Sequence, residues 1–198
     1  MRKRFNRILI PLLIIVVVVS GVIAYFKLSQ SGAVENVGEG YLSPGTPPNM
    51  IPNGVYVWDW DKSLFYRVNS SGDRSYYLPE SDGYYLYYFH NNLCPHCQYF
   101  ESKLQPFLRS GGANDLKGKI EIILVACNWF TSDCTDPIAR NTFTAFNVLS
   151  SPTFLLIRIS NGKIANIVDI SQEYIKAFPG SSEFEPDKVF LLVRAYVS

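Results

Sequence analysis

The sequence of 198 residues has few cysteines, very little net charge and no internal repeat. Its four cysteines are too few for a small disulfide scaffold, although they suffice for two pairs. Five of the 18 basic residues lie in the first 27 positions, which hold no acid, so 13 basic and 17 acidic residues remain in 28–198. Because that part lacks a basic excess, nucleic acid is disfavoured as a partner. The composition also excludes a disordered, a fibrous and a polytopic membrane protein.

Ile8–Phe26 is a run of 19 residues without a charge. An α-helix of that length nearly matches a hydrocarbon core of about 30 Å. Four basic residues precede the run and only Lys27 follows it, so the positive-inside rule predicts a cytoplasmic basic stub at 1–7. The sequence therefore predicts a single-pass membrane protein whose remaining chain lies outside the cytoplasmic membrane.

The alternative interpretation of this run is a cleaved signal peptide. Such a peptide has an apolar region of about 7–15 residues that ends in a small-x-small cleavage site. The run at 8–26 is longer, and Val22-Ile23-Ala24 is a poor cleavage site. These features favour a retained transmembrane signal-anchor, and the rest of the chain works outside the cytoplasm in either case.

The remaining chain divides by composition into two parts. Residues 27–53 are rich in Gly, Pro, Ser and Asn with almost no apolar periodicity, which predicts a flexible tether. Residues 54–198 are expected to form the folded domain. Strands at 55–60, 64–68 and 74–78 are predicted to form an N-terminal β-meander.

The pattern after the meander alternates between strands and helices, which predicts an α/β domain with a mixed central sheet flanked by helices. The expected strands are 84–90, 119–126, 153–159 and 163–170. The first expected helix begins near Cys97, and the other two span 136–148 and 187–196. Pro106 is predicted to kink or end the first helix. Asn161-Gly162 predicts a tight hairpin turn between the last two strands.

Cys94, Pro95, His96 and Cys97 lie where a strand passes into a helix. At a helix N-terminus, unpaired N–H groups and the helix dipole stabilise a thiolate, and Pro95 suits the first helical position. His96 adds a donor and, when protonated, a positive charge. We expect the pKa of Cys94 to fall below about 8.5 and its disulfide to become more oxidising. Cys97, one turn on, is expected to resolve a mixed disulfide.

Three other uses of a Cys-x-x-Cys motif compete with redox catalysis. A zinc site would add Cys127 and Cys134, but six residues between them are too many for a usual second ligand pair. Haem attachment requires His at position 98, where the sequence has Gln98. A purely structural disulfide is the third alternative. Redox catalysis is favoured, with no metal and no cofactor beyond the redox-active Cys94–Cys97 disulfide.

The motif also carries a family resemblance. The strand, the Cys-Pro-His-Cys sequence, the helix, and Ser151-Pro152 opening a strand 55 residues after Cys97 resemble the thioredoxin superfamily. The run CPHCQYFESKL resembles the DsbA-type disulfide oxidases. The resemblance covers roughly 84–198 and implies a thioredoxin-like fold, a cis Pro152 packed against the cysteines, and a Ser151 backbone that binds substrate peptide.

This sequence departs from the family at two places. Tyr88, six residues before Cys94, occupies the position where the family has a buried acid that relays protons. A different group or water then moves the proton, or turnover is slow. The gap between Cys97 and Pro152 is also too short for the helical domain of the DsbA type, so its substrate surface is not implied.

Cys127 and Cys134 form the second pair. Because an exported compartment permits disulfides, they are predicted to bond and brace their loop. A second redox pair that relays electrons to the first is the alternative, disfavoured because no helix start or base activates Cys127. His90 is expected to be a hydrogen-bonded core or surface residue, although it lies close enough to Cys94 to tune the cysteines.

The sequence thus predicts a membrane-tethered, extracytoplasmic thiol–disulfide oxidoreductase that forms or isomerises disulfides in exported proteins. Its partners would be the thiols of exported or membrane proteins and a membrane or soluble redox protein that recycles the site. Two alternatives stay open: a thiol reductant, for example in cytochrome maturation, and a non-catalytic thioredoxin-like binding module.

Overall fold

A six-stranded mixed sheet forms the centre of the structure, a computed structural model that describes residues 40–68 and 75–197. The strand order is β2-β1-β4-β3-β5-β6, with β3 and β4 parallel and the other neighbours antiparallel. The strands are β1 Gly54–Asp59, β2 Leu64–Arg67, β3 Gly83–Asn91, β4 Ile120–Cys127, β5 Thr153–Ser160 and β6 Lys163–Asp169. The architecture is therefore mixed α/β, as the sequence predicts.

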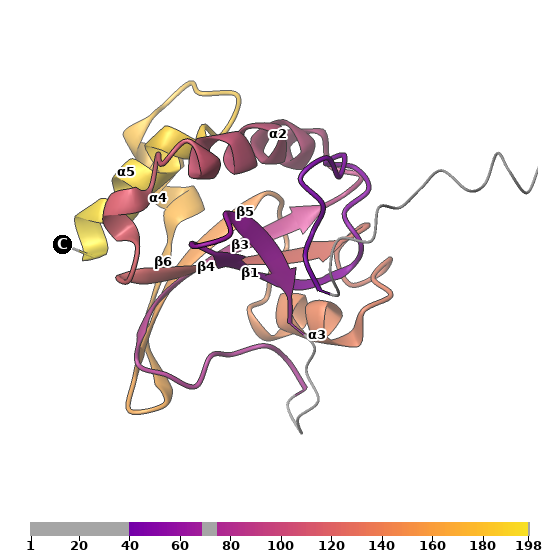
Figure 1. Cartoon of the computed structure of the whole chain (residues 1–198), viewed down its shortest axis with the longest axis horizontal. Coiled ribbons are helices and arrows are strands. Elements are labelled where there is room, and N and C mark those ends of the chain that lie inside the picture. Colours follow the sequence, from indigo (N-terminus) through magenta and orange to yellow (C-terminus); the bar gives the residue numbers. More distant parts are fainter. Residues whose placement is uncertain (1–39, 69–74, 198) are drawn as a thin grey trace, which may run out of the picture. The chain divides into compact units, whose positions relative to one another are not determined.

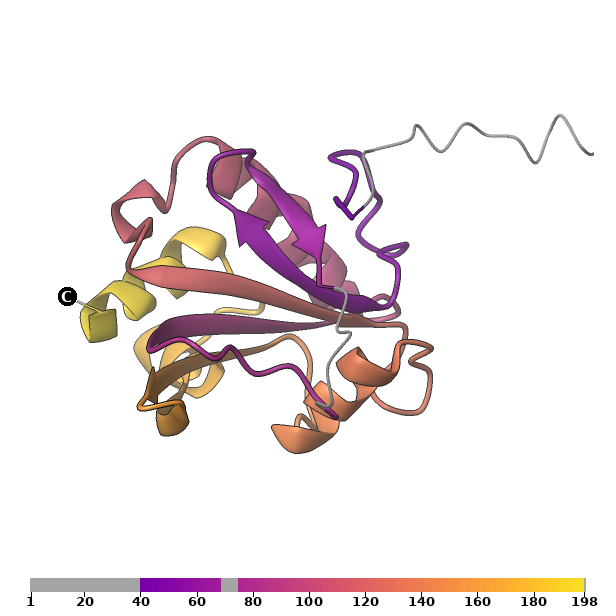
Figure 2. The same ribbon diagram turned by 60° about the horizontal axis from the view of Figure 1, so that its bottom comes forward.

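Helices cover both faces of this sheet (Figure 1). They are α2 Pro95–Arg109, α3 Pro137–Ala145, α4 Ile170–Ala177 and α5 Pro186–Val197, with a 3₁₀ turn at Asn114–Leu116. Figures 1 and 2 show α3 on the opposite side of the sheet from α2. Two apolar cores result, one under α2, α4 and α5 and the other under α3.

The alternation of side chains along β3 explains its dense aromatic sequence. Leu86 and Tyr88 pack in the core under α2, whereas Tyr85, Tyr87 and Phe89 pack in the core under α3. Since β3 is flanked by β4 and β5 and covered on both faces, nearly all of its side chains are buried. This central strand leads directly into the Cys-x-x-Cys motif.

The prediction of a third strand in the meander is wrong. In its described part, residues 75–78, the chain forms no strand. The N–H of Tyr77 donates to Oγ1 of Thr142 at 3.0 Å, and Nδ2 of Asn141 donates to the carbonyl of Ser75 at 2.6 Å. Because side chains of α3 bind its backbone, this segment does not pair with the sheet. The N-terminal addition is a β1–β2 hairpin joined to β4 by β1.

Pro106 does not end the first helix, which continues to Arg109. The ring lies on the exposed side of α2, and the carbonyl that loses its helical hydrogen bond belongs to Ser102, which is also exposed. Water can therefore replace the missing bond. Ser110 caps the helix at its C-terminus and is followed by Gly111, whose φ is 84°.

A short helix, α4, which the sequence does not predict, follows β6 without a loop. Asp169 caps it by accepting a hydrogen bond from the N–H of Gln172 at 3.0 Å. The predicted strand at 163–170 extends through this cap, so its last residue, Ile170, belongs to the helix. The Asn161-Gly162 turn is confirmed, with φ of 54° and 68° at the two residues.

The folded part of the chain begins earlier than predicted. Leu42 and Ile51 are 4% and 1% exposed and pack in the core under α2, and Tyr41 forms a β-bridge with Tyr66. Residues 41–53 are therefore part of the domain and not tether. In the ranges 40–68 and 75–197 no helix is both long and apolar enough to cross a membrane, and the predicted anchor at 8–26 lies outside the described residues.

Candidate active site

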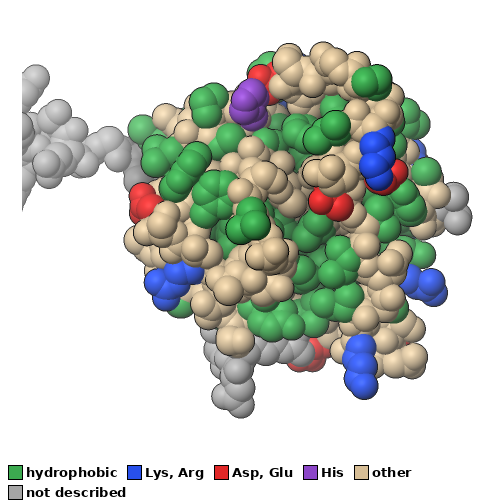
Figure 3. Space-filling view, turned by 180° about the vertical axis from the view of Figure 1, so that it is seen from behind, with side chains coloured by type: hydrophobic (Ala, Val, Ile, Leu, Met, Phe, Trp, Pro, Cys, Tyr) green, Lys and Arg blue, Asp and Glu red, His purple; other side chains and the backbone are tan. Residues whose placement is uncertain are grey.

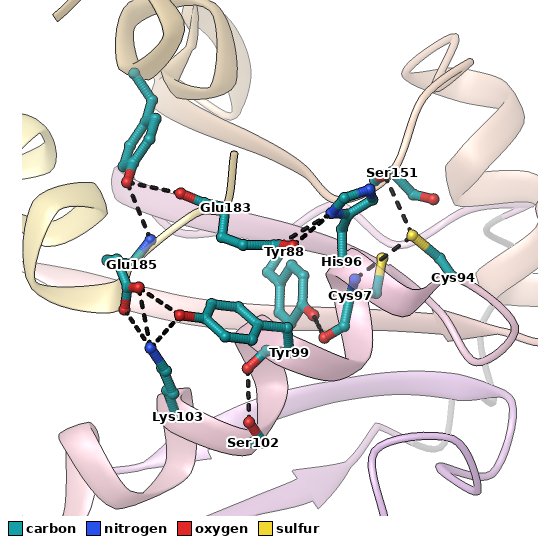
Figure 4. Close-up of polar contacts among 11 residues, drawn as sticks. Tyr88, Cys94, His96, Cys97, Tyr99, Ser102, Lys103, Ser151, Glu183 and Glu185 are labelled. Atoms are coloured by element: carbon teal, nitrogen blue, oxygen red, sulfur yellow. Dashed lines mark hydrogen bonds and ion pairs between the residues drawn. The ribbon is translucent and has the colours of Figure 1, made fainter. Parts of the chain in front are cut away.

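The Cys-x-x-Cys motif lies at the point where β3 passes into α2. Cys94 is the N-cap of α2, and Pro95 occupies the first helical position, where its missing N–H costs nothing. Cys97 follows in the first turn. Both cysteines are unbonded thiols in this structure, and Figure 4 shows their sulfurs beside Ser151.

Cys94 has the surroundings of a stabilised thiolate. Its Sγ accepts a hydrogen bond from the N–H of Cys97 at 3.4 Å, and in the thiol form it donates to the carbonyl oxygen of Ser151, also at 3.4 Å. Hydrogen bonding by the Cys97 side chain, only partly opposed by burial, lowers the pKa of Cys94 to about 5. Cys94 is therefore ionised at neutral pH, and the direction of its pKa shift is the one that the sequence predicts.

Cys97 has the opposite character. Its side chain is fully buried, and burial raises the pKa of this thiol well above its ordinary range. The backbone N–H of Asn91, at the end of β3, donates to its Sγ at 3.5 Å. One turn of helix thus separates a thiolate from a buried thiol.

The Ser151-Pro152 segment lies next to the cysteines, where the resemblance places it. The peptide bond between the two residues is cis, and Pro152 is buried. The contact between Cys94 and the Ser151 carbonyl joins segments 57 residues apart in the sequence. All six predicted residues of the motif and this segment are thereby brought to one end of the sheet.

His96 contacts an acid, Glu183, that the sequence does not identify as a site residue. Its Nδ1 lies 3.0 Å from the carboxylate of Glu183, and this contact raises the pKa of His96 (Figure 4). Glu183 lies between α4 and α5, 87 residues along the chain. No local motif marks such a partner, so only the fold reveals it.

His90 is a fully buried, hydrogen-bonded core residue. Its Nε2 lies 2.8 Å from the carbonyl of Pro48 and 3.1 Å from Oδ1 of Asn92, and because both are acceptors, Nε2 carries the hydrogen. Nδ1 is then free to accept from the hydroxyl of Tyr88 at 2.8 Å. Burial lowers the pKa of His90 to about 4, so it is neutral at physiological pH.

Cys127 and Cys134 are joined by a disulfide. Their sulfurs are therefore not zinc ligands here, and the described residues hold no group of three side chains suited to a metal. Both cysteines pack in the core under α3, on the other face of the sheet from α2. The N–H of Asn92 donates to the carbonyl of Cys127 at 2.9 Å, so the loop supports the turn before Cys94 through its backbone.

Apolar side chains are exposed beside the site. Leu93 directly precedes Cys94 and is 62% exposed, and Leu149, two residues before Ser151, is 81% exposed. Hydrophobic side chains are also exposed on the face shown in Figure 3, with few charged groups among them. Such patches are typical of surfaces that bind other proteins.

No family model and no curated protein matches the sequence. Among solved structures, a thioredoxin from Aeropyrum pernix is similar to this chain. The two are 16% identical with a TM-score of 0.37, and the alignment covers 65% of this chain and 95% of the thioredoxin.

Proposed function

We propose that this protein is a thiol–disulfide oxidoreductase that is tethered to the membrane and acts on exported proteins outside the cytoplasm. The observation that carries the proposal is the contrast between Cys94 and Cys97. A thiolate at a helix N-terminus can attack or be attacked at sulfur, and a buried thiol one turn away can resolve the mixed disulfide that forms.

In the oxidising direction, a substrate thiolate attacks Sγ of Cys94 in the Cys94–Cys97 disulfide. The bond between the two cysteines breaks, and Cys97 leaves with the electron pair and takes up a proton. A second substrate thiolate then attacks the substrate sulfur of the mixed disulfide, the substrate disulfide forms, and Cys94 leaves as a thiolate. The substrate loses two electrons, which a redox partner must remove from the reduced pair before the next cycle.

The low pKa of Cys94 favours this direction. A stabilised thiolate is a good leaving group and stabilises the reduced form, so the disulfide is more oxidising. Disulfide formation or isomerisation is therefore preferred to thiol reduction. The backbone at Ser151, in contact with Cys94, is suited to hold the substrate chain, and exposed Leu93 and Leu149 are suited to contact its apolar residues.

Two features support the proposed membrane tether and the proposed location outside the cytoplasm. The uncharged run at 8–26 has the length of a membrane anchor with a basic cytoplasmic flank. The Cys127–Cys134 disulfide is typical of oxidising compartments and rare in the cytosol.

Trapping tests the activity. In Cys97→Ser the mixed disulfide at Cys94 cannot be resolved, so we expect covalent complexes that non-reducing gels detect and reductant releases. Cys94→Ser is the matched control and should trap none. Absence of complexes in Cys97→Ser cells would contradict the oxidoreductase.

The direction of electron flow is tested by equilibrating the full chain with glutathione. We expect a reduction potential well above the roughly −270 mV of thioredoxin. A value at or below that figure would assign the protein to the reductants instead.

A further inference from the structure

Glu101, on α2, is the one acid among the buried polar side chains of the described residues. It is 2% exposed. Its Oε1 accepts a hydrogen bond from Nε2 of Gln105 at 2.8 Å, and its Oε2 has no hydrogen-bonding partner among the described residues. A buried carboxyl oxygen left unpaired is costly, and such groups concentrate at functional sites.

The position of Glu101 relates it to Cys97. The two residues are four apart in α2, so they lie on the same face, one turn from each other. That face packs on the sheet, where Tyr88 lies on β3 beneath the helix. The hydroxyl of Tyr88 lies 3.1 Å from the carbonyl oxygen of Cys97 (Figure 4). Burial is the largest cause that raises the pKa of Tyr88, and the charges of Cys97 and Glu101 are the next largest. The phenol of Tyr88 therefore lies within electrostatic reach of both side chains.

We propose that the carboxylate of Glu101 accepts the proton of the Cys97 thiol when Cys97 resolves a mixed disulfide, directly or through a water molecule, and returns it in the reverse step. This inference rests on the proposed function. Glu101 is then the proton acceptor, a role that Tyr88, six residues before Cys94, does not fill.

In a mixed disulfide with glutathione, Cys94 carries the glutathione and Cys97 is a thiol. The proton of Cys97 passes to the carboxylate of Glu101, and the thiolate of Cys97 attacks Sγ of Cys94. The bond between Cys97 and Cys94 forms while the bond between Cys94 and glutathione breaks. Glutathione leaves with the electron pair, and Glu101 afterwards gives its proton to water or to the leaving thiolate.

The acidity of Glu101 suits this exchange. Burial raises its pKa to about 7, while the hydrogen bond from Gln105 and the charge of Arg109, farther along α2, lower it. A group that titrates near the working pH exchanges protons most effectively. Arg109 binds Oε1 of Gln105 at 2.6 Å, so the three side chains form a hydrogen-bonded row along the helix.

The other titratable groups near the cysteines are less suited. The pKa of about 4 makes His90 a weak base, and its Nε2 hydrogen is held by acceptors. Burial raises the pKa of Tyr88 and keeps its phenol protonated. His96 is exposed and paired with Glu183 on the outer side of α2.

The test isolates the resolving step in the reduced full chain, purified in detergent. Oxidised glutathione is added, the reaction is quenched with acid at intervals, and mass spectrometry follows the glutathione adduct of Cys94 as it forms and decays. In the wild type we expect the decay rate to rise with pH through a midpoint near the pKa of Glu101, about 7.

Glu101→Gln should slow the decay at neutral pH by about 100-fold and remove this midpoint, because it keeps the shape and loses the base. Formation of the adduct, which depends on Cys94, should be unchanged. Glu101→Asp restores a carboxyl and should recover part of the rate. Glu121→Gln is the control, since partial burial also raises the pKa of Glu121, but this acid lies at an exposed position of β4.

Wild-type decay without a midpoint near neutral pH overturns the inference even if Glu101→Gln does not fold. A folded Glu101→Gln protein with the wild-type decay rate also overturns it. Both results leave the proposed function intact, because an adduct still forms and resolves. Failure of the proposed function is different: the wild type would then form no adduct, and Cys97→Ser would trap no substrate.

Discussion

Nδ1 of His96 lies 3.0 Å from the carboxylate of Glu183, and the two side chains form an ion pair when the imidazole is protonated. The pair joins the first turn of α2 to the segment between α4 and α5. Glu185, two residues on, binds the same helix, since it accepts hydrogen bonds from the hydroxyl of Tyr99 at 2.6 Å and from Lys103 at 2.8 Å (Figure 4). This segment is therefore attached to α2 at two points next to the Cys-x-x-Cys motif.

Glu183→Gln should lower the pKa of His96 toward its ordinary value of about 6.5, because the hydrogen bond and charge of Glu183 are what raise it. A pKa raised by folding stabilises the protein fully below the unfolded pKa, and this stabilisation is lost as pH rises through the folded pKa. The variant should thus melt below the wild type at about pH 5.5 and like it at about pH 8.5. NMR titration of the His96 ring checks the cause.

Glu173→Gln is the control for this prediction. It removes an exposed ion pair with Lys176 on α4 that involves no histidine. Its effect on melting should not change between these two pH values. If Glu183→Gln lowers the melting temperature equally at both pH values, the loss comes from packing and not from the charge of His96.

Cys97→Ala should raise the pKa of Cys94 from about 5, because hydrogen bonding by the Cys97 side chain is the largest cause that lowers it. The pH dependence of alkylation by iodoacetamide measures this midpoint, since only the thiolate reacts. Ser102→Ala, on the exposed side of the same helix, should leave the midpoint unchanged. An unchanged midpoint in Cys97→Ala would assign the low pKa to the helix N-terminus alone.

The sequence predicts the main strands and α2 because their signals are local. Buried strands such as β3 are continuous apolar runs, the Asn161-Gly162 turn requires positive φ, and Pro95 marks a helix start. The short helix α4 shows only Ile170 and Tyr174 as buried apolar residues one turn apart. So weak a periodicity does not separate it from the end of a strand.

The site is predictable only where its residues are adjacent in sequence or belong to a recognised motif. Glu183 reaches His96 through tertiary packing, which no local pattern records. Glu101 is missed for a different reason: charged residues are seldom buried, so a Glu in a helix is assigned to the exposed face. The sequence does not predict that residues 41–53 belong to the domain, because this segment is rich in Pro and its two core residues, Leu42 and Ile51, are isolated and form no periodic pattern.

Replacing both Cys127 and Cys134 with Ala should destabilise the domain by about 2–3 kcal/mol, as the closed loop is short. Urea unfolding measures the loss. If the disulfide is structural, mixed disulfides should still be trapped when Cys97→Ser is added, because the two pairs lie on different faces of the sheet. Unchanged stability with loss of turnover would instead favour a second redox pair.

Ile51→Ala should cost about 2–5 kcal/mol of unfolding free energy, although the residue precedes the first strand. Its side chain is 1% exposed in the core under α2, and removing buried methylenes from a packed core costs that much. Met50→Ala, next to it and 65% exposed, should change stability by less than about 0.5 kcal/mol. Urea unfolding of both variants measures the difference. Equally small losses of unfolding free energy in the two variants would mean that residues 41–53 do not stabilise the fold. The folded domain would then begin at residue 54, as the sequence predicts.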